Sequence, residues 1–307
     1  MAKRSKVEPI RNPTLFEMDK LEKTPDSIGG RNGRPYDADL NILLGTSAFT
    51  AAGWSGSFYP EGTKPADYLS YYAHKFKTVE IDSTYYGTPS ASTVSNWYSK
   101  TPYDFLFAAK VPQIITHDKI LLNCEAEFDE FINRMQLLAE KLGPLLLQFP
   151  HFDRYHFPAP DEFFHRLRFF LKRATGMFPL KFAVEIRNPQ WLSIRLTDLL
   201  AEHKVALVLN DTSFVPRPWE MKEKFDLITA DFAYVRWLGD RKGIEKQTKS
   251  WDKTVVDRTE DLKNWVQLFR QFINDKRIRK LFAYANNHYA GNGPETVKLF
   301  WDLYNKE

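Results

Sequence analysis

The sequence predicts an α/β protein that forms a single (β/α)8 TIM-like barrel with an irregular N-terminal arm. Three observations support this fold class. Eight short apolar runs each end near a polar residue or a glycine, segments with helical spacing lie between them, and the runs recur about every 34 residues, the length of one strand–helix unit. A doubly wound open sheet is the second interpretation, but the sequence contains neither of the glycine-rich nucleotide-binding motifs that would favour it.

Residues 1–38 are predicted to form a flexible or draped arm. Four prolines and the pair Gly29–Gly30 interrupt this segment, and no apolar period is sustained along it. A solvated tail is the simpler interpretation of its basic residues, and contact with an anionic partner is the alternative. We expect the barrel domain to occupy residues 39–307.

The eight apolar runs are predicted to be parallel strands covered on both faces, because their hydrophobicity is continuous rather than alternating. In a barrel, the carboxyl ends of such strands and the loops after them form the active face. The runs are NILLG (41–45), TVEID (78–82), FLFAAK (105–110), LLLQF (145–149), KFAVEIR (181–187), VALVLND (205–211), AYVRW (233–237) and LFAYANN (281–287).

Helices are predicted between the strands. Apolar residues recur every three or four positions over 128–142 and 262–273, which is typical of amphipathic helices. Pro65 and Pro294 are expected in first helical turns, where proline is well tolerated.

The composition excludes several classes of protein. With 43% hydrophobic and 27% charged residues in 307, the chain is neither collagenous nor wholly disordered. No apolar run approaches the roughly 18 residues that cross a bilayer, so no membrane partner is expected. The N-terminus lacks the apolar stretch of a secretory signal and Cys124 is the only cysteine, so we expect a cytoplasmic protein. The net charge of +4 permits anionic partners without requiring nucleic acid.

Glu80, Glu185 and Lys110 are the candidate catalytic residues. The two glutamates interrupt apolar strands, where a buried carboxylate needs a partner or a function. Structural ion pairs, for example of Glu185 with Lys110 or Arg236, and acid–base catalysis or metal ligation remain alternative hypotheses. Lys110 is the last residue of the third predicted strand. Its side chain could serve as an electrophile, a phosphate contact or an amine nucleophile, or it could form a structural ion pair.

Two arginines add to the positive charge predicted at the barrel mouth. Arg187 and Arg236 offer planar forks that match carboxylate or phosphate groups, so a small anionic molecule is the expected ligand. The other predicted substrate-binding residues are polar, imidazole or aromatic side chains at strand ends or in the loops that follow, namely Gln148, Asp211, Asn286, Asn287, His117, Trp54 and Tyr85.

A second anion-binding element is predicted after the last strand. Gly291, Asn292 and Gly293 precede a helix, where free main-chain N–H groups favour anions, and a plain helix-capping loop is the alternative. His117 and His288 are the histidines best placed near the mouth, but no HExxH or HxH spacing accompanies them. No metal site is predicted, and the cofactor is left unknown.

Seven ordered blocks resemble the YecE-like family, the domain-of-unknown-function family number seventy-two. The resemblance implies a TIM-like barrel with no settled reaction. Relatives usually carry Asn at Asp82 and His at Asn188 and Leu238, so this chain is altered if those histidines serve catalysis or metal binding. The blocks are GTSAFTAAGWSGSFYP (45–60), FKTVEIDSTYYGTPS (76–90), FLFAAKVPQIITH (105–117), GPLLLQFP (143–150), FAVEIRNPQW (182–191), AYVRWLG (233–239) and FAYANNHYAGNGPE (282–295).

The leading functional hypothesis is an enzyme, with a hydrolase or isomerase favoured, that acts on a small anionic or phosphorylated, polyhydroxylated substrate. A nucleic-acid-binding or phosphodiester-processing barrel is the second hypothesis, by analogy of fold with repair endonucleases and sugar isomerases. The basic arm and the loop GDRKGIEKQTKSWDK (239–253) would serve it. A non-catalytic ligand-binding barrel is the third.

Overall fold

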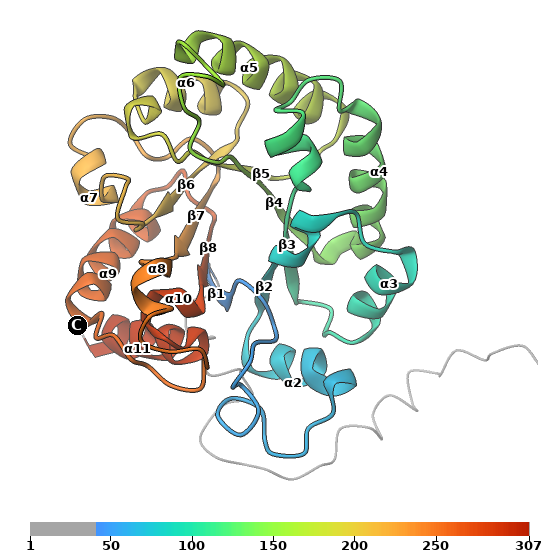
Figure 1. The fold of residues 1–307 in the computed structure, drawn as a ribbon, viewed down its shortest axis with the longest axis vertical. Helices are drawn as coiled ribbons and strands as arrows, with labels where there is room; N and C mark the ends of the chain where they lie inside the picture. Colours follow the sequence, from blue (N-terminus) through green and yellow to red (C-terminus); the bar gives the residue numbers. More distant parts are fainter. Residues whose placement is uncertain (1–40, 307) are drawn as a thin grey trace, which may run out of the picture. The chain divides into compact units, whose positions relative to one another are not determined.

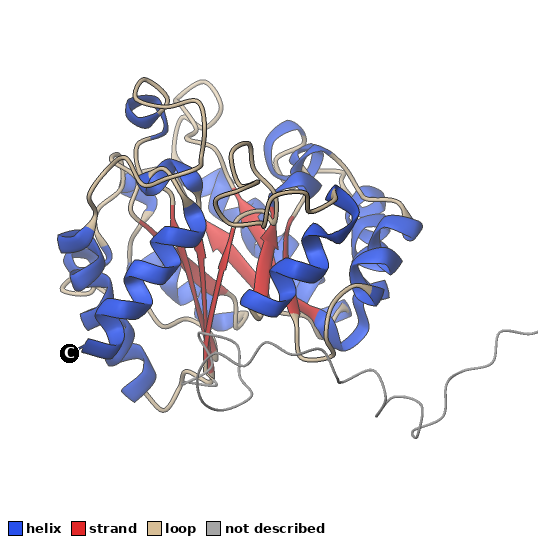
Figure 2. Cartoon of the chain, turned by 90° about the horizontal axis from the view of Figure 1, so that it is seen from below, coloured by secondary structure: helices blue, strands red, loops and turns tan. Residues whose placement is uncertain are grey.

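The computed structural model describes residues 41–306. The arm predicted over residues 1–38 lies outside the described residues, as do residues 39, 40 and 307. Within the described part, strands and helices alternate along the chain, and the helices surround the strands (Figures 1 and 2). No described helix combines the length and the apolarity that a membrane span requires.

Eight parallel strands form the wall of the barrel, in the order β1-β8-β7-β6-β5-β4-β3-β2, so the predicted fold is confirmed. Each predicted apolar run overlaps one of these strands. They are β1 (Ile42–Thr46), β2 (Thr78–Ile81), β3 (Leu106–Lys110), β4 (Leu142–Gln148), β5 (Phe182–Glu185), β6 (Ala206–Asn210), β7 (Phe232–Trp237) and β8 (Lys280–Ala285).

The described residues show no ladder pairing between β1 and β2, the two ends of the strand order. A side chain bridges these two strands instead. The Tyr72 hydroxyl accepts a hydrogen bond from Thr46 N at 2.8 Å and donates one to Thr78 O at 3.2 Å. Gly45 permits the close approach, since a Cβ there would lie 2.2 Å from Thr78 O. The ring of strands is therefore completed by a tyrosine.

Among residues 41–306, seven helices of eight or more residues cover the outer face of the strands (Figure 2). Their buried apolar stripes pack on the outward-facing strand residues in one large core. They are α2 (Tyr68–Lys75), α3 (Ala91–Ser99), α4 (Glu125–Met135), α5 (Pro160–Met177), α6 (Ile194–Glu202), α9 (Thr259–Asn274) and α11 (Gly293–Lys306).

The prediction of a continuous helix over 128–142 is wrong at its C-terminal end. Helix α4 stops at Met135 and continues as the 3-10 turn η4 (Gln136–Lys141), in which Ala139 has φ 47°. That backbone conformation cannot continue an α-helix, and Leu142 already belongs to β4. The predicted helix over 262–273 lies within α9, and Pro294 occupies the first turn of α11. Pro65 opens the 3-10 turn η1 (Pro65–Asp67) ahead of α2.

A second, smaller apolar cluster fills the inside of the barrel. Alternate residues of the strands contribute to it, including Ala108, Leu146, Ala183, Val208 and Tyr234. Two positions further along β3, β4, β5, β6 and β7 the inward-facing side chains become polar, namely Lys110, Gln148, Glu185, Asn210 and Arg236. The change from apolar to polar residues marks the carboxyl-terminal mouth.

Candidate functional site

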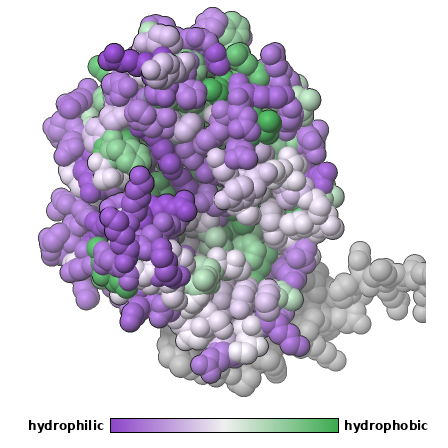
Figure 3. Space-filling view, in the orientation of Figure 1, coloured by the Kyte–Doolittle hydropathy of each residue, from purple (hydrophilic) through white to green (hydrophobic). Residues whose placement is uncertain are grey.

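A cavity of about 860 Å³ opens at the carboxyl ends of the strands, where the sequence predicted the site. In the view along the barrel, hydrophilic side chains gather over α8 (Arg241–Ile244) beside this mouth (Figure 3). Residues from the ends of β3, β4 and β7 and from the loops after β2, β3, β5, β6, β7 and β8 line the cavity. They are Asp82, Ser83, Tyr85, Tyr86, Lys110, His117, Gln148, Arg187, Thr212, Ser213, Phe214, Arg236, Leu238, Gly239, Asp240, Arg241, Lys242, Asn286 and His288.

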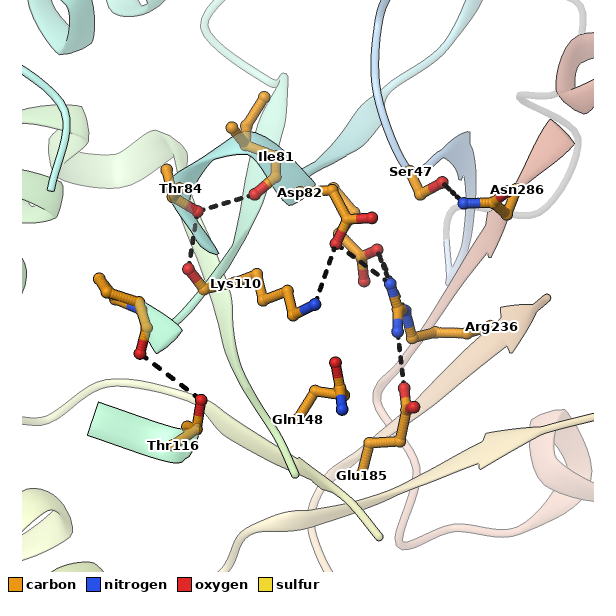
Figure 4. A network of polar contacts seen from close by, with 12 residues as sticks. Ser47, Ile81, Asp82, Thr84, Lys110, Thr116, Gln148, Glu185, Arg236 and Asn286 are labelled. Carbon is orange, nitrogen blue, oxygen red and sulfur yellow. Dashed lines mark hydrogen bonds and ion pairs between the residues drawn. The ribbon is translucent and has the colours of Figure 1, made fainter. Parts of the chain in front are cut away.

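Arg236 forms the floor of the cavity and joins three carboxylates (Figure 4). Its Nη2 donates to Glu80 Oε1 at 2.7 Å, and its Nη1 donates to Glu185 Oε2 at 2.7 Å. A longer contact of 3.3 Å joins Nη2 to Asp82 Oδ1. The buried guanidinium thus neutralises glutamates from two other strands.

Glu80 is fully buried and has both carboxylate oxygens occupied. Oε1 accepts from Arg236, and Oε2 accepts from the Tyr234 hydroxyl at 2.6 Å. Burial raises the pKa of Glu80 and the nearby Asp82 raises it further, while Arg236 opposes both effects. Glu80 does not line the cavity, so it reaches a ligand only through Arg236.

Glu185 is equally buried but is held by two arginines. Arg187 Nε donates to its Oε1 at 2.9 Å and Arg236 to its Oε2. Burial raises the pKa of Glu185, but the charges and hydrogen bonds of Arg236 and Arg187 lower it more, to about 2. Glu185 is therefore an ionised structural partner of the two arginines and, like Glu80, does not line the cavity.

Lys110 projects from the end of β3 into the cavity (Figure 4). Its Nζ lies 3.8 Å from Asp82 Oδ1 and 4.1 Å from the centroid of the Tyr85 ring. The Thr84 hydroxyl donates to the main-chain oxygens of Ile81 and Lys110 and so fixes the segment after β2 against the end of β3. Burial lowers the pKa of Lys110 in spite of Asp82.

His117 and Gln148 line the same wall as Lys110. Thr116 Oγ1 lies 2.8 Å from Nδ1 of His117, and the Tyr85 ring packs edge-on against the imidazole. Burial, followed by the charges of Lys110 and Arg187, lowers the pKa of His117 to about 4, so this imidazole is neutral near pH 7. Gln148 Nε2 donates to Phe149 O, and strand register sets Gln148 beside Glu185.

Three of the predicted binding residues do not line the cavity. Asp211 is buried, and its Oδ1 accepts from the main-chain N–H groups of Leu238 and Gly239 at 3.0 and 3.3 Å. Asn287 Oδ1 accepts from Trp54 Nε1 and from Gly293 N, and Trp54 is only 1% exposed. These side chains hold the loops after β7 and β8 in place, and only Asn286 of the two asparagines reaches the cavity.

The predicted anion-binding turn is packed as a helix cap. Gly293 N donates to Asn287 Oδ1 at 2.8 Å, and Asn292 Oδ1 accepts from Glu295 N at 2.9 Å. Gly291 has φ 115°, and a Cβ on it would lie 2.6 Å from Lys253 O. Gly291, Asn292 and Gly293 are all buried and none of them lines the cavity. The geometry corresponds to the capping alternative.

Several cavity residues were absent from the predicted binding set. Asp82 is the clearest example of such a residue, since its carboxylate is about one-third exposed in the cavity. Its position directly after β2 is a sequence feature that could have identified it. Tyr86 and Phe214, from the loops after β2 and β6, are 80% and 49% exposed at the rim. Only the tertiary structure identifies Arg241 and Lys242 as cavity residues, because they follow β7 in a generally basic segment.

The two positions at which relatives are expected to carry histidine have different surroundings. Asn188 is buried, and its side chain accepts from Phe152 N at 2.9 Å and donates to Phe152 O at 2.8 Å. It therefore clamps the loop after β4. Leu238 instead lines the cavity. Residues 41–306 contain no group of three His, Cys, Asp or Glu side chains placed to hold a metal ion.

Comparison with known proteins gives consistent matches. A family model described as "Protein of unknown function DUF72" matches residues 43–307. The chain is 35% identical to UPF0759 protein YecE of Escherichia coli K12 over 126 residues, which is 41% of this chain and 43% of that protein. It is 32% identical to UPF0759 protein YunF of Bacillus subtilis over 149 residues, 46% of this chain and 50% of that protein. The chain thus spans half or less of the length of these curated relatives.

A solved structure supports the fold. The crystal structure of a DUF72 family protein from Thermotoga maritima has a TM-score of 0.66 and 26% sequence identity. The match covers 87% of this chain and 100% of that one. The similarity therefore extends over nearly the whole described barrel.

Proposed function

The chain belongs to the DUF72 family of proteins of unknown function, and from that premise we propose that it is an enzyme acting on a small anionic, phosphorylated and polyhydroxylated molecule in the barrel cavity. Hydrolysis and isomerisation are the favoured reaction classes. Hydrolysis requires proton transfer from water and to the leaving oxygen, and isomerisation of a sugar requires proton transfer at the carbon beside the carbonyl group.

The observation that carries this proposal is the excess of fixed positive charge in the cavity wall. Five lysines and arginines line the cavity and only two carboxylates, Asp82 and Asp240, accompany them. Arg236 is largely neutralised by the buried glutamates. The other cations are Lys110, Arg187, Arg241 and Lys242, of which Arg187 also pairs with Glu185 and Arg241 with Glu245.

Arg187 is the best-placed anion ligand. Its Nε is occupied by Glu185, and within residues 41–306 its two Nη groups have no hydrogen-bond acceptor. A phosphate group would accept from this free end of the fork in a charge-assisted contact. Gln148, Asn286 and Ser213 would then hold hydroxyl groups of the same molecule.

The proposed roles divide between groups that line the cavity and groups buried behind its wall. Asp82 and Lys110 reach the cavity and are the candidates for proton transfer. Glu80 and Glu185 serve as positioning residues, because their oxygens already accept from Arg236, Arg187 or Tyr234. They orient the cations on which a ligand would rest.

The direct test is ligand binding to the full chain, purified without added phosphate and followed by titration calorimetry and native mass spectrometry. Triose, pentose and hexose phosphates are compared with the same unphosphorylated sugars and with inorganic phosphate. We expect saturable binding of at least one sugar phosphate, weaker binding of its neutral sugar and weakening by salt. Equal binding of neutral sugars, or binding of none of the phosphorylated compounds, would contradict the proposal.

The nucleic-acid hypothesis is tested in the same format with single- and double-stranded oligonucleotides. The basic segment around Arg241 and Lys242 borders the cavity and is the surface that would contact a phosphate backbone. Oligonucleotide binding that a sugar phosphate does not displace would favour this second function over the first.

A further inference from the structure

We propose that Lys110 forms an imine with a carbonyl carbon of the molecule bound in the cavity, so that the substrate class is a phosphorylated aldehyde or ketone. This inference rests on the proposed function, because it uses the same cavity and the same anion contacts. It goes further by assigning a covalent step and the functional group that takes part in it.

The first argument is the lack of a close partner for the Lys110 amine. The side chain is only 11% exposed, yet within residues 41–306 its Nζ donates no hydrogen bond to the protein. The nearest carboxylate oxygen, Asp82 Oδ1, is 3.8 Å away, beyond hydrogen-bond length. Asp82 and the Tyr85 ring, 4.1 Å away, compensate the charge of this amine but accept no hydrogen bond from it, so its donors are available to a ligand.

Lys141 provides an internal comparison. It is also buried, and its Nζ also lies over a tyrosine ring, 4.2 Å from the centroid of Tyr98. However, Lys141 donates to Tyr98 O at 2.6 Å, to Thr101 O at 2.7 Å and to Thr101 Oγ1 at 3.3 Å. A structural buried lysine of this protein therefore has its donors satisfied, and Lys110 differs by pointing into the cavity with its donors free.

The second argument is the charge around Lys110. The two glutamates of the barrel floor are held by Arg236, and Asp82 also contacts that guanidinium. The charged groups facing Lys110 are thus Asp82 after β2, Glu80 on β2, Glu185 on β5 and Arg236 on β7, with neutral His117 and Tyr85 beside it. Burial and the charge of Arg236 lower the pKa of Lys110 against the effect of the carboxylates, which increases the fraction of the amine in its neutral, nucleophilic form.

Formation of the imine needs only the Lys110 amine, the carbonyl group of the bound molecule and a group that relays protons. The neutral amine adds through its lone pair to the carbonyl carbon, and one of its two N–H protons passes to the carbonyl oxygen to give a carbinolamine. The second N–H proton, relayed by Asp82 as the nearest carboxylate, passes to the same oxygen, which leaves as water while the nitrogen lone pair forms the carbon–nitrogen double bond. No oxidant or reductant is needed, and hydrolysis of the imine restores the lysine.

The test is reductive trapping with dihydroxyacetone phosphate as the probe and sodium borohydride as the reductant, followed by intact-mass and peptide mass spectrometry. Reduction of the imine adds the mass of the probe less one oxygen atom. We expect one such addition, located on Lys110, at a probe concentration that leaves the exposed Lys276 unmodified. Unphosphorylated dihydroxyacetone should label Lys110 at least tenfold more slowly, because it lacks the group that Arg187 would hold.

The matched variants are Lys110→Met and Lys276→Met. The first should abolish the addition and the second should leave it unchanged, with thermal unfolding of both showing that the barrel is intact. If Lys110→Met does not fold, the site of addition in the wild-type peptide map still decides. Labelling spread over exposed lysines, or an undiminished addition in folded Lys110→Met, would overturn the inference.

The outcomes separate the inference from the proposed function. Saturable binding of sugar phosphates without any borohydride-stable addition would refute the imine and retain the anion site. A trapped Lys110 adduct with equal rates for dihydroxyacetone and its phosphate would retain the imine and count against the phosphorylated substrate.

Discussion

The guanidinium of Arg236 is bonded to Glu80 through two donors, with Nε and Nη2 lying 3.1 and 2.7 Å from the same oxygen, Oε1. The two residues are 156 positions apart in the chain and both are almost fully buried. A buried pair of this kind depends on both partners, because removal of one leaves an uncompensated charge in the barrel interior. The pair therefore stabilises the floor of the cavity and also orients its cations.

Replacing Arg236 by methionine should destabilise the fold by about 3–5 kcal/mol at pH 7, because Glu80 and Glu185 then lie buried without a shared cation. The measurement is the free energy of unfolding from urea titration. The loss should shrink as the pH falls from 7 toward about 4.5, since a buried carboxyl without its cation has a raised folded-state pKa and destabilises the fold only above its unfolded-state value. Arg241→Met, which alters a side chain that is 76% exposed, is the control and should change the free energy by less than about 0.5 kcal/mol.

Glu185→Gln should reduce the sensitivity of the fold to acid. Burial raises the pKa of Glu185, but Arg236 and Arg187 lower it to about 2 from an ordinary value of 4.5. The depressed pKa stabilises the folded state above about pH 4.5, and this stabilisation is lost as the pH falls toward 2. Unfolding midpoints at pH 7, 4 and 3 should fall less steeply in Glu185→Gln than in the wild type. The exposed Glu202→Gln should keep the wild-type slope, and an unchanged slope in Glu185→Gln would refute the assignment.

Arg187→Gln should weaken the binding of the best sugar phosphate by about tenfold, which corresponds to about 1.4 kcal/mol. The reason is the loss of the two Nη groups that have no acceptor in the described part of the chain. Calorimetric titration provides the measurement, and the dependence of affinity on salt should also decrease. Arg195→Gln, on the outer helix α6, is the matched control, and equal effects of the two substitutions would exclude a specific anion contact.

Asn188→Leu should destabilise the fold by about 1–3 kcal/mol, because it leaves the N–H and C=O groups of buried Phe152 without partners. Affinity for the sugar phosphate should remain within about twofold of the wild type, since Asn188 does not line the cavity. Urea unfolding and calorimetry measure the two effects separately. A loss of affinity without a loss of stability would instead place Asn188 among the ligand contacts.

The barrel itself was predictable because it depends on features that are local and repeated. Eight apolar runs at a spacing of one strand–helix unit leave few alternative folds, and the polar residues that end them mark one face of the barrel. Lys110, Gln148, Arg187 and Asn286 were placed at the cavity on that basis, and the structure finds them there.

Which site residues line the cavity and which act as buried partners could be assigned only from the tertiary structure. Side-chain direction alternates along a strand, so whether a polar residue faces a cavity, a helix or a buried partner depends on register and on the packing of other strands. Asp211 and Asn287 are predicted to bind ligand because each ends a predicted strand. In the structure, their side chains instead accept hydrogen bonds from main-chain N–H groups of neighbouring segments. The sequence by itself determined the strands and the end of the barrel that carries polar groups. Only the fold decided that Arg236 pairs with Glu80 and Glu185 and that no closer carboxylate than Asp82, at 3.8 Å, faces the Lys110 amine, because such pairings join segments far apart in the chain.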